Sequence, residues 1–409
     1  MWCGNNEIYE GLRYWGWKEK YTPEVYQQML EGYDVLFRQL LPEKVKELDP
    51  GRFYLEGSPY EANWGRPESW KIADSHNWGT WYGQKPFESL DKEIPRFMSE
   101  YGFQAFPEMK TISTFAAPED YQIESPVMNA HQKSTIGNAL IKKTMALYYP
   151  VPEKFEDLVY AGLVLQGQGM RHGMEAHRRN RPYCMGSLPW QLNDSWPVVS
   201  WSAIDYYGNW KAMQYQTQRA FAPVLINAIR EGDKLRVYVL SDCLKGEKVT
   251  LQLEWTDFQG KVHRRQQIDG NLPVNASEVL YEEDWQKAFA ACDTTASFLR
   301  MTLKGHQSRK ILSDEVYYPV YPKYQRLPKA KISCKKTPKK GVYELTLKSN
   351  LLARDVFIEI PVQGVRFSDN FFDLLPGVTK KVTVSSADGS PLEDITVHIH
   401  QLSDITSNY

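Results

Sequence analysis

The chain has 409 residues, with 49 basic and 50 acidic side chains, a formal net charge of −1 and 42% hydrophobic residues. This composition is typical of globular domains and excludes collagenous, coiled-coil and extensively disordered proteins. The balanced charge argues against nucleic-acid binding by phosphate neutralisation. The sequence contains no apolar run of about 18 residues, the length that would predict a membrane-spanning helix. Five widely spaced cysteines fit neither a disulfide framework nor a CxxC metal site.

The first residues, Met1–Glu7, have the pattern of a buried strand that runs into polar residues. Domain termini are usually polar and frayed. We therefore expect the chain to be the C-terminal part of a longer protein.

Strand-like and helix-like segments alternate over the first half. Thr22-Pro23-Glu24 predicts a helix start, with a capping hydroxyl, a proline in the first turn and an acid near the positive dipole end. Asp49-Pro50-Gly51 predicts its end. Besides the strand at the first residues, we expect strands at 53–57, 72–78, 96–102 and 183–188, and helices at about 127–148, 153–178 and 208–220. This alternation predicts a parallel sheet with outer helices, three strands short of an eight-stranded barrel.

The hydrophobic period changes to two in the second half. Leu235, Val237 and Val239 alternate with polar residues, and similar runs recur to the end of the chain. Short alternating strands separated by turn residues predict antiparallel sandwiches. The sequence therefore predicts three domains, at 1–223, 224–328 and 329–409.

Two glutamates have matching positions in the predicted sheet. Glu7 follows Asn5-Asn6 at the end of the first strand, and Glu100 lies at the end of the strand at 96–102. The carboxyl ends of parallel barrel strands face the active site, and paired carboxylates are what glycoside hydrolysis needs. The alternative is that each is an ordinary surface or ion-paired glutamate.

Aromatic side chains cluster in the segments after these strands. They are Trp15, Trp17, Trp64, Trp70, Trp78, Trp81, Tyr82 and Trp190. Sugar rings present C–H faces that pack on indole, so such loops suit a carbohydrate ligand. The alternative is that these side chains only fill the core, which we expect for Trp2, Trp196, Trp201 and Trp210.

Three motifs carry a resemblance to a known family. Trp2-Cys3-Gly4-Asn5-Asn6-Glu7, Ser99-Glu100-Tyr101-Gly102 and the segment 190–197 (WQLNDSWP) together resemble the β-mannosidases of glycoside hydrolase family 2. The resemblance implies a multidomain α/β plus all-β chain. Strands 4–8 of a (β/α)8 TIM barrel would be followed by two immunoglobulin-like β-sandwiches, as in the C-terminal half of that family.

This resemblance implies a retaining exo-β-mannosidase that releases terminal β-D-mannose from an oligosaccharide or glycan by double displacement. It implies no cofactor and no metal, and a periplasmic, secreted or lysosomal location. The first three barrel strands would come from a missing N-terminal half, so we expect this chain to be inactive alone.

The resemblance also assigns roles to individual residues. Glu7 matches the acid/base and Glu100 the nucleophile, and a retaining pair lies about 5–5.5 Å apart. Glu7 would be protonated, whereas Glu100 would stay ionised with Tyr82 as a donor beside it. The implied substrate contacts are Asn6 at the sugar 2-OH, Trp15 at the lip of the subsite, His76 and Trp78 lining it, Tyr82 beside the nucleophile, and Trp190 as the platform under the sugar.

Two alternatives remain open. The first is a family 2 enzyme of another specificity, such as a β-glucuronidase or β-galactosidase. The second is a non-catalytic carbohydrate-binding module that uses the tryptophan-rich loops. Asp194 could support catalysis, although we expect it to order the loop that carries Trp190.

Overall fold

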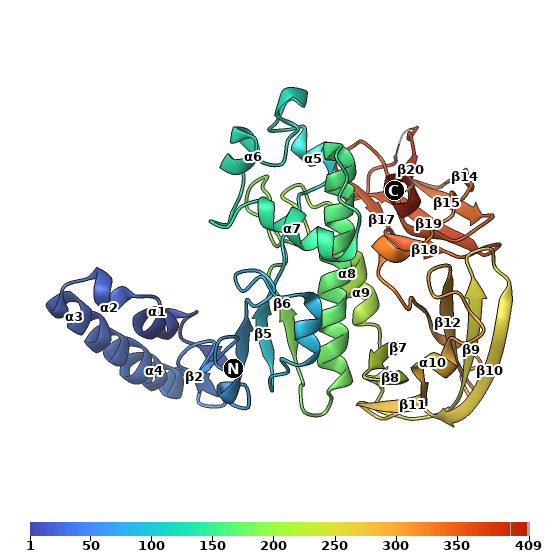
Figure 1. Cartoon of the computed structure of the whole chain (residues 1–409). Helices are drawn as coiled ribbons and strands as arrows, with labels where there is room; N and C mark the ends of the chain where they lie inside the picture. The colour runs from blue at the N-terminus through green and yellow to red at the C-terminus, as the bar shows by residue number, and fades with distance from the viewer. Residues whose placement is uncertain (393, 407–409) are drawn as a thin grey trace. The chain divides into compact units, whose positions relative to one another are not determined.

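The computed structural model describes residues 1–392 and 394–406. The chain forms two compact units (Figure 1). The first comprises Met1–Gly102 with Asn180–Pro189, and the second comprises Phe103–Arg179 with the chain from Trp190 onward. In the part of the chain that the structure describes, no helix combines the length and apolar character needed to cross a membrane.

The first unit contains short parallel strands. β1 (Trp2–Cys3) pairs with β2 (Tyr54–Leu55). A second, four-stranded sheet has the order β3 (Ala62–Asn63), β4 (Ser75–Asn77), β5 (Met98–Tyr101) and β6 (Ser187–Pro189). The β1–β2 pair and the three neighbouring pairs of the four-stranded sheet are all parallel, as the alternation of strands and helices predicts. β3 is a strand that the sequence pattern does not predict.

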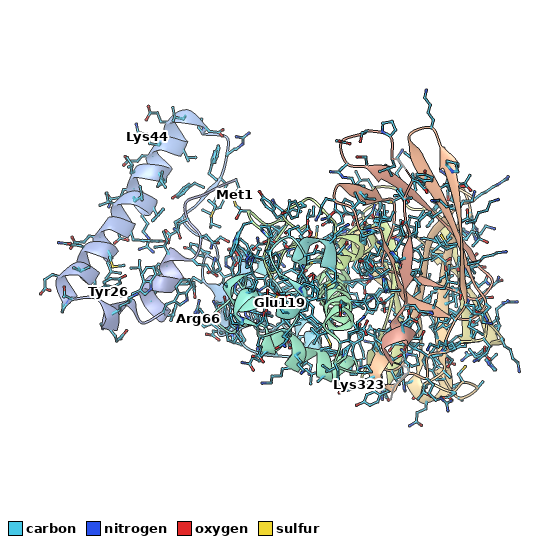
Figure 2. All side chains as sticks on the ribbon, turned by 90° about the horizontal axis from the view of Figure 1, so that it is seen from above. Met1, Tyr26, Lys44, Arg66, Glu119 and Lys323 are labelled. Carbon is cyan, nitrogen blue, oxygen red and sulfur yellow. The ribbon has the colours of Figure 1, made fainter. Side chains whose placement is uncertain are left out.

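A helical run connects β1 to β2. It consists of α1 (Ile8–Tyr14), α2 (Trp17–Lys20), α3 (Pro23–Tyr33), the π-helix η1 (Asp34–Leu40) and α4 (Leu41–Leu48). The predicted start at Thr22 is confirmed, because its side chain accepts a hydrogen bond from the backbone N–H of Val25 at 3.4 Å. Figure 2 shows Tyr26 and Lys44 towards opposite ends of the α3–η1–α4 run. Two short 3-10 helices, η2 (Pro67–Ser69) and η3 (Phe87–Asp91), lie in the loops before β4 and β5.

The segment around β4 is buried although it is polar. Every residue from 74 to 80 is buried, including Asp74, Ser75, His76 and Asn77. β4 lies between β3 and β5, so sheet neighbours flank it on both sides. Buried polar groups are costly unless they are hydrogen-bonded, and this segment therefore depends on polar partners.

The second unit begins with helices. They are α5 (Met109–Ile112), η4 (Pro118–Asp120), α6 (Pro126–Ala130), α7 (Ala139–Tyr148), α8 (Phe155–Arg179) and α9 (Ala212–Ala220). The prediction of one helix over 127–148 is wrong, because the chain leaves the helical path between α6 and α7. Gly137 has φ +80° there, a left-handed conformation that ends helices.

Two antiparallel sandwiches follow, as the period-two pattern predicts. The first contains β7 (Val224–Glu231), β8 (Lys234–Ser241), β9 (Lys248–Asp257), β10 (Val262–Asn271), β11 (Ala276–Asp284), β12 (Ser297–Gly305) and β13 (Ile311–Tyr317), with α10 (Trp285–Ala288) after β11. Its two sheets have the orders β10-β9-β12-β13 and β11-β8-β7. Their inner faces enclose a core that includes Leu251, Leu253 and Trp255, all fully buried.

The second sandwich begins after the short helix η5 (Pro322–Tyr324). It contains β14 (Ile332–Lys339), β15 (Val342–Ser349), β16 (Ala353–Glu359), β17 (Val365–Phe367), β18 (Phe372–Leu374), β19 (Thr379–Ser386) and β20 (His398–His400), followed by α11 (Leu402–Thr406). The sheet orders are β14-β15-β19-β17 and β18-β16-β20.

Candidate active site

Glu7 lies in a tight turn between β1 and α1. Its backbone has φ 59°, in the left-handed region. The neighbouring Asn5 holds the turn from both sides, because its side chain donates to the carbonyl of Glu56 at 2.7 Å and accepts from the N–H of Ile8 at 3.1 Å. The N–H of Glu7 donates to the carbonyl of Ser58 at 2.9 Å. These bonds fix the direction in which the Glu7 side chain leaves the backbone.

Glu100 lies on β5 and pairs in register with His76 on β4. The structure brings Glu7, His76 and Glu100 together in the first unit. One carboxylate oxygen of each glutamate and a ring nitrogen of His76 all lie within 4.8 Å of one another.

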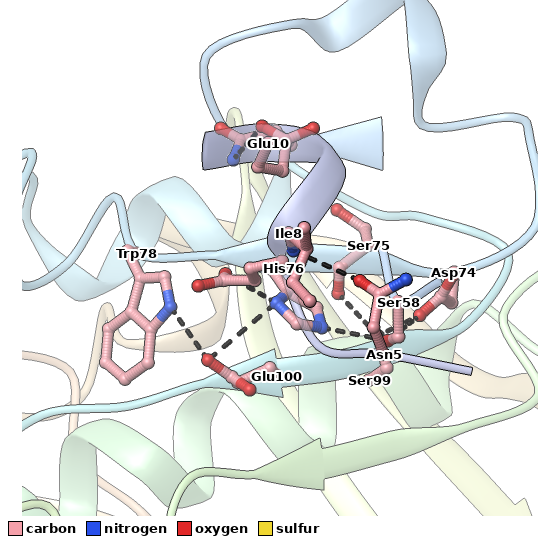
Figure 3. Close-up of polar contacts among 12 residues, drawn as sticks. Asn5, Ile8, Glu10, Ser58, Asp74, Ser75, His76, Trp78, Ser99 and Glu100 are labelled. Carbon is pink, nitrogen blue, oxygen red and sulfur yellow. Dashed lines mark hydrogen bonds and ion pairs between the residues drawn. The ribbon is translucent and has the colours of Figure 1, made fainter. Parts of the chain in front are cut away.

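His76 is the centre of the hydrogen-bond network (Figure 3). Its Nδ1 lies 2.6 Å from Oε1 of Glu7 and 3.7 Å from Oε1 of Glu100. Its Nε2 lies 3.0 Å from Oγ of Ser58. The ring is 1% exposed, so both of its nitrogens must find partners within the protein.

Trp78 is the indole donor to Glu100. Its Nε1–H donates to Oε1 of Glu100 at 3.0 Å, and the ring is buried. Tyr82 is partly exposed and packs edge-on against Trp78, with ring centroids 5.7 Å apart. The hydrogen bond makes Trp78 a donor to Glu100, and the predicted role of Tyr82 beside the nucleophile stays a prediction.

Opposing influences act on the charge of Glu100. Burial raises the pKa of its carboxyl above the ordinary 4.5, and the nearby Glu7 raises it further. His76 and the hydrogen bond from Trp78 lower the same pKa. The net direction is upward, so the ionised form that a nucleophile needs depends on these two partners.

The remaining predicted contacts are less closely tied to the carboxylates. Asn6 is exposed and forms an isolated parallel bridge with Ser58. Trp15 is half exposed at the end of α1, where its ring meets that of Trp17 with centroids 6.0 Å apart. Trp190 begins the later segment of the second unit and is also partly exposed.

The loop that carries Trp190 is ordered by Asp194. Its Oδ2 accepts hydrogen bonds from the hydroxyls of Ser200 at 2.8 Å and Ser202 at 2.6 Å. These contacts agree with the expectation that Asp194 orders this loop.

Sequence reasoning missed three residues of the network. Asp74 accepts from the hydroxyls of Ser58 at 2.5 Å and Ser99 at 2.6 Å, and from the N–H of Tyr60 at 3.0 Å. The three missed residues, Ser58, Asp74 and Ser99, come from three different segments. Small polar residues beside short strands have no distinctive spacing in a sequence. Only the register of β4 against β5 brings Asp74 close to Ser99.

The cluster of Glu7, His76 and Glu100 also has the donor atoms of a divalent metal site. Nδ1 of His76 and Oε1 of Glu7 lie 2.6 Å apart, at hydrogen-bond distance from each other. We therefore do not assign these residues as metal ligands.

The chain is similar to known mannosidases. Residues 233–324 match a family model described as a mannosidase Ig/CBM-like domain, and residues 327–405 match one described as an Ig-fold domain of mannosidases. β-Mannosidase B of Aspergillus fumigatus is 27% identical over 413 aligned positions, covering 94% of this chain and 48% of the relative. β-Mannosidase B of Thermothelomyces thermophilus is also 27% identical, with 95% and 49% covered.

A solved structure agrees with these relatives. The crystal structure of a β-D-mannosidase from Dictyoglomus thermophilum is similar with a TM-score of 0.82 and 28% identity, over 98% of this chain and 48% of that one. The chain resembles the C-terminal half of a glycoside hydrolase family 2 β-mannosidase.

The β-mannosidase-like chain spans about half the length of the curated relatives it matches. An exo-chitosanase from Amycolatopsis orientalis shares the fold, with a TM-score of 0.63 at 18% identity over 78% of this chain and 44% of that one. The chain is accordingly a glycosidase-like protein with immunoglobulin-like mannosidase domains.

Proposed function

We propose that this chain carries the catalytic carboxylates of a retaining exo-β-mannosidase. The observation that supports this most directly is the pair Glu7 and Glu100, with one oxygen of each within 4.8 Å. Inverting enzymes need about 6.5–9.5 Å between the carboxyl groups to admit a water molecule, whereas retaining enzymes use about 5–5.5 Å. The names of the relatives favour mannosides among the possible substrates.

Glu100 is the proposed nucleophile. Its oxygen attacks the anomeric carbon, the bond from that carbon to the leaving oxygen breaks, and a covalent glycosyl-enzyme forms. Trp78 is placed to donate to the attacking carboxylate. The hydrogen bond and the nearby His76 oppose the effect of burial, and they favour the ionised form.

Glu7 is the proposed acid/base. It gives a proton to the leaving oxygen in the first step and takes one from the attacking water in the second. The turn at Asn5 and the bond from the N–H of Glu7 to the carbonyl of Ser58 hold this carboxyl beside His76. Asn6, Trp15, Tyr82 and Trp190 are proposed to contact the sugar.

We further propose that residues 1–223 are the C-terminal part of a TIM barrel, followed by sandwiches at 224–328 and 329–409. The parallel pairing of β1 with β2 and of β3 to β6 supports this arrangement. Because the chain spans about half of its relatives, we expect it to act together with an N-terminal half and to be nearly inactive alone.

Hydrolysis of 2,4-dinitrophenyl β-mannoside tests this proposal. We would assay the 409-residue chain and a chimera in which it replaces the segment it matches in the Dictyoglomus thermophilum enzyme. Turnover by the chimera, lost in Glu100→Gln and kept in Glu47→Gln, is the expected result, because Glu47 is an exposed residue of α4. Thermal melting would verify that each variant is folded.

A folded chimera that hydrolyses no aryl β-mannoside would contradict the assignment. Faster turnover of β-glucuronides or β-galactosides would indicate a family 2 enzyme with that specificity instead of a β-mannosidase. Mannose binding without turnover, unchanged by Glu100→Gln, would indicate a non-catalytic binding module.

A further inference from the structure

The proton between His76 and Glu7 can be placed from hydrogen-bond donors and acceptors alone. Oδ2 of Asp74 faces the hydroxyls of Ser58 and Ser99, and Oδ1 faces the N–H of Tyr60. A carboxylate surrounded by three donors acts as an acceptor only. The single hydroxyl proton of Ser58 is therefore committed to Asp74, at 2.5 Å.

The oxygen of Ser58 can then only accept from its other neighbour. That neighbour is Nε2 of His76, at 3.0 Å. Nε2 must therefore carry a proton. A neutral imidazole has one N–H and one bare nitrogen, so in the neutral ring Nδ1 is the bare nitrogen.

Nδ1 faces Oε1 of Glu7 at 2.6 Å. A contact this short between a nitrogen and a carboxyl oxygen needs a proton between them. If the ring is neutral, the proton is on Glu7. If the ring is charged, the proton is on Nδ1 and Glu7 is ionised. In both cases the His76–Glu7 pair holds one proton beyond the one on Nε2.

We propose that Asp74 and Ser58 are positioning residues that fix the Nε2–H form of His76, so that the His76–Glu7 pair stores the proton given to the leaving group. This inference rests on the proposed function, and it adds a source for the acid proton. When the leaving oxygen takes the proton, the pair is left with a bare Nδ1 and a Glu7 carboxylate. The attacking water then returns one proton to the pair as its oxygen bonds to the anomeric carbon, and the bond from that carbon to Glu100 breaks, which frees the sugar and restores the Glu100 carboxylate.

The charges around His76 are consistent with this storage. Oε1 of Glu100 lies 3.7 Å from Nδ1. Asp74 acts on the other side through Ser58. On β3, the register partner Asn63 contacts Glu10, which is paired with Arg66. On β4 itself, Asn77 contacts Glu93, which is paired with Lys85. These two flanking acids are paired with cations, whereas the carboxyl groups of Asp74, Glu7 and Glu100 lie around the ring within the described segments.

Nitrogen NMR of the histidine rings tests the proposal without any need for turnover. The 409-residue chain would be labelled with ¹⁵N-histidine, and the His76 signals would be assigned by comparison with His76→Gln. We expect Nε2 to be protonated across the pH range in which the chain is folded. A neutral His76 with the proton on Nδ1 and a bare Nε2 would overturn the proposal.

Two serine variants provide a matched pair. Ser58→Ala removes the acceptor of Nε2–H, whereas Ser99→Ala removes a hydrogen bond to the same Asp74 oxygen without touching His76. We expect the His76 signals to move towards a mixture of tautomers in Ser58→Ala and Asp74→Asn, and to move much less in Ser99→Ala. Equal changes in both serine variants, or no change in either, would show that Ser58 is not the link.

Leaving-group dependence gives a second readout in the chimera. Dinitrophenolate needs no proton to depart, whereas phenolate does, and acid catalysis typically contributes about 10²–10⁴-fold. We expect Ser58→Ala to slow the phenyl β-mannoside by about tenfold or more, with little effect on the dinitrophenyl substrate. Equal slowing of both substrates would indicate a structural role only. If no substrate reacts, the proposed function fails, while the NMR result still decides where the proton lies.

Discussion

β4 in the first unit and β9 in the second are both buried strands, but for opposite reasons. β9 alternates, and its buried residues include Val249, Leu251, Leu253 and Trp255. β4 is buried along its whole length, and its residues Ser75, His76 and Asn77 are polar. Burial of β9 is favourable by itself, because apolar surface leaves water. Burial of β4 costs free energy unless each polar group has a partner.

β9 therefore contributes mainly to stability, whereas the polar residues of β4 form part of the candidate site. Apolar contacts stabilise the sandwich without regard to pH. The hydrogen bonds around β4 place charged groups where they can react, and their strength depends on protonation. Substitutions in the two strands should therefore have different signatures.

The largest effect on stability is expected in the sandwich. Trp255→Ala removes a fully buried indole from the core, and large-to-small changes of this kind cost about 3–5 kcal/mol. Urea unfolding of the second unit would measure the loss. Val262→Ala, at a partly exposed position of β10, should cost far less. A similar cost for both variants would contradict the assignment of Trp255 to the core.

A smaller effect, on chemistry, is expected at Trp78. Trp78→Phe keeps an aromatic ring but removes the N–H that donates to Glu100. A hydrogen bond to a charged group contributes about 1.5–3 kcal/mol, so the rate of the chimera should fall by roughly tenfold to a hundredfold. Trp70→Phe is the matched control, because the Trp70 indole donates to the backbone carbonyl of Asn63 instead. If both variants lose the same activity, the donor to Glu100 is not what matters.

The smallest effect is a change of stability with pH. Burial raises the pKa of Glu100 above 4.5 in the folded chain. Protonated Glu100 therefore stabilises the folded chain fully at pH values below the pKa of this carboxyl in the unfolded chain, where it is protonated in both states. This stabilisation is lost as pH rises through the pKa of Glu100 in the folded chain. Glu100→Gln should become more stable relative to the parent over that interval. Unfolding free energies measured from pH 4 to 8 would reveal the trend, and a flat difference would contradict it.

The sequence predicts β9 and its neighbours well because their apolar period is visible in the residues themselves. Thr22 and Pro23 likewise predict the start of α3 from local chemistry. The break at Gly137 is missed because a single glycine inside a helical pattern is often tolerated. β3 is missed because a strand of two residues is too short to show any period.

The candidate site is predictable only in part. Glu7 and Glu100 could be proposed from the sequence because each follows a strand-like pattern, and their motifs resemble a family. The link through Ser58 and Asp74 cannot be predicted from either segment alone, because it depends on the register of β4 and on the path of the chain after β2. The sequence places Trp78 among the aromatic residues of the site. Its role as a hydrogen-bond donor cannot be predicted without the position of Glu100.

The backbone of Glu7, held at φ 59°, has a practical consequence for protein engineering. A residue with a Cβ in this conformation is strained by roughly 1–2 kcal/mol, and glycine is not. Alanine at position 7 would remove the carboxyl and keep the strain, whereas glycine would remove both. On the proposed assignment of Glu7 as the acid/base, Glu7→Gly is therefore the natural choice for a variant that must stay folded while it retains a trapped glycosyl group for structural work or for transfer to another acceptor.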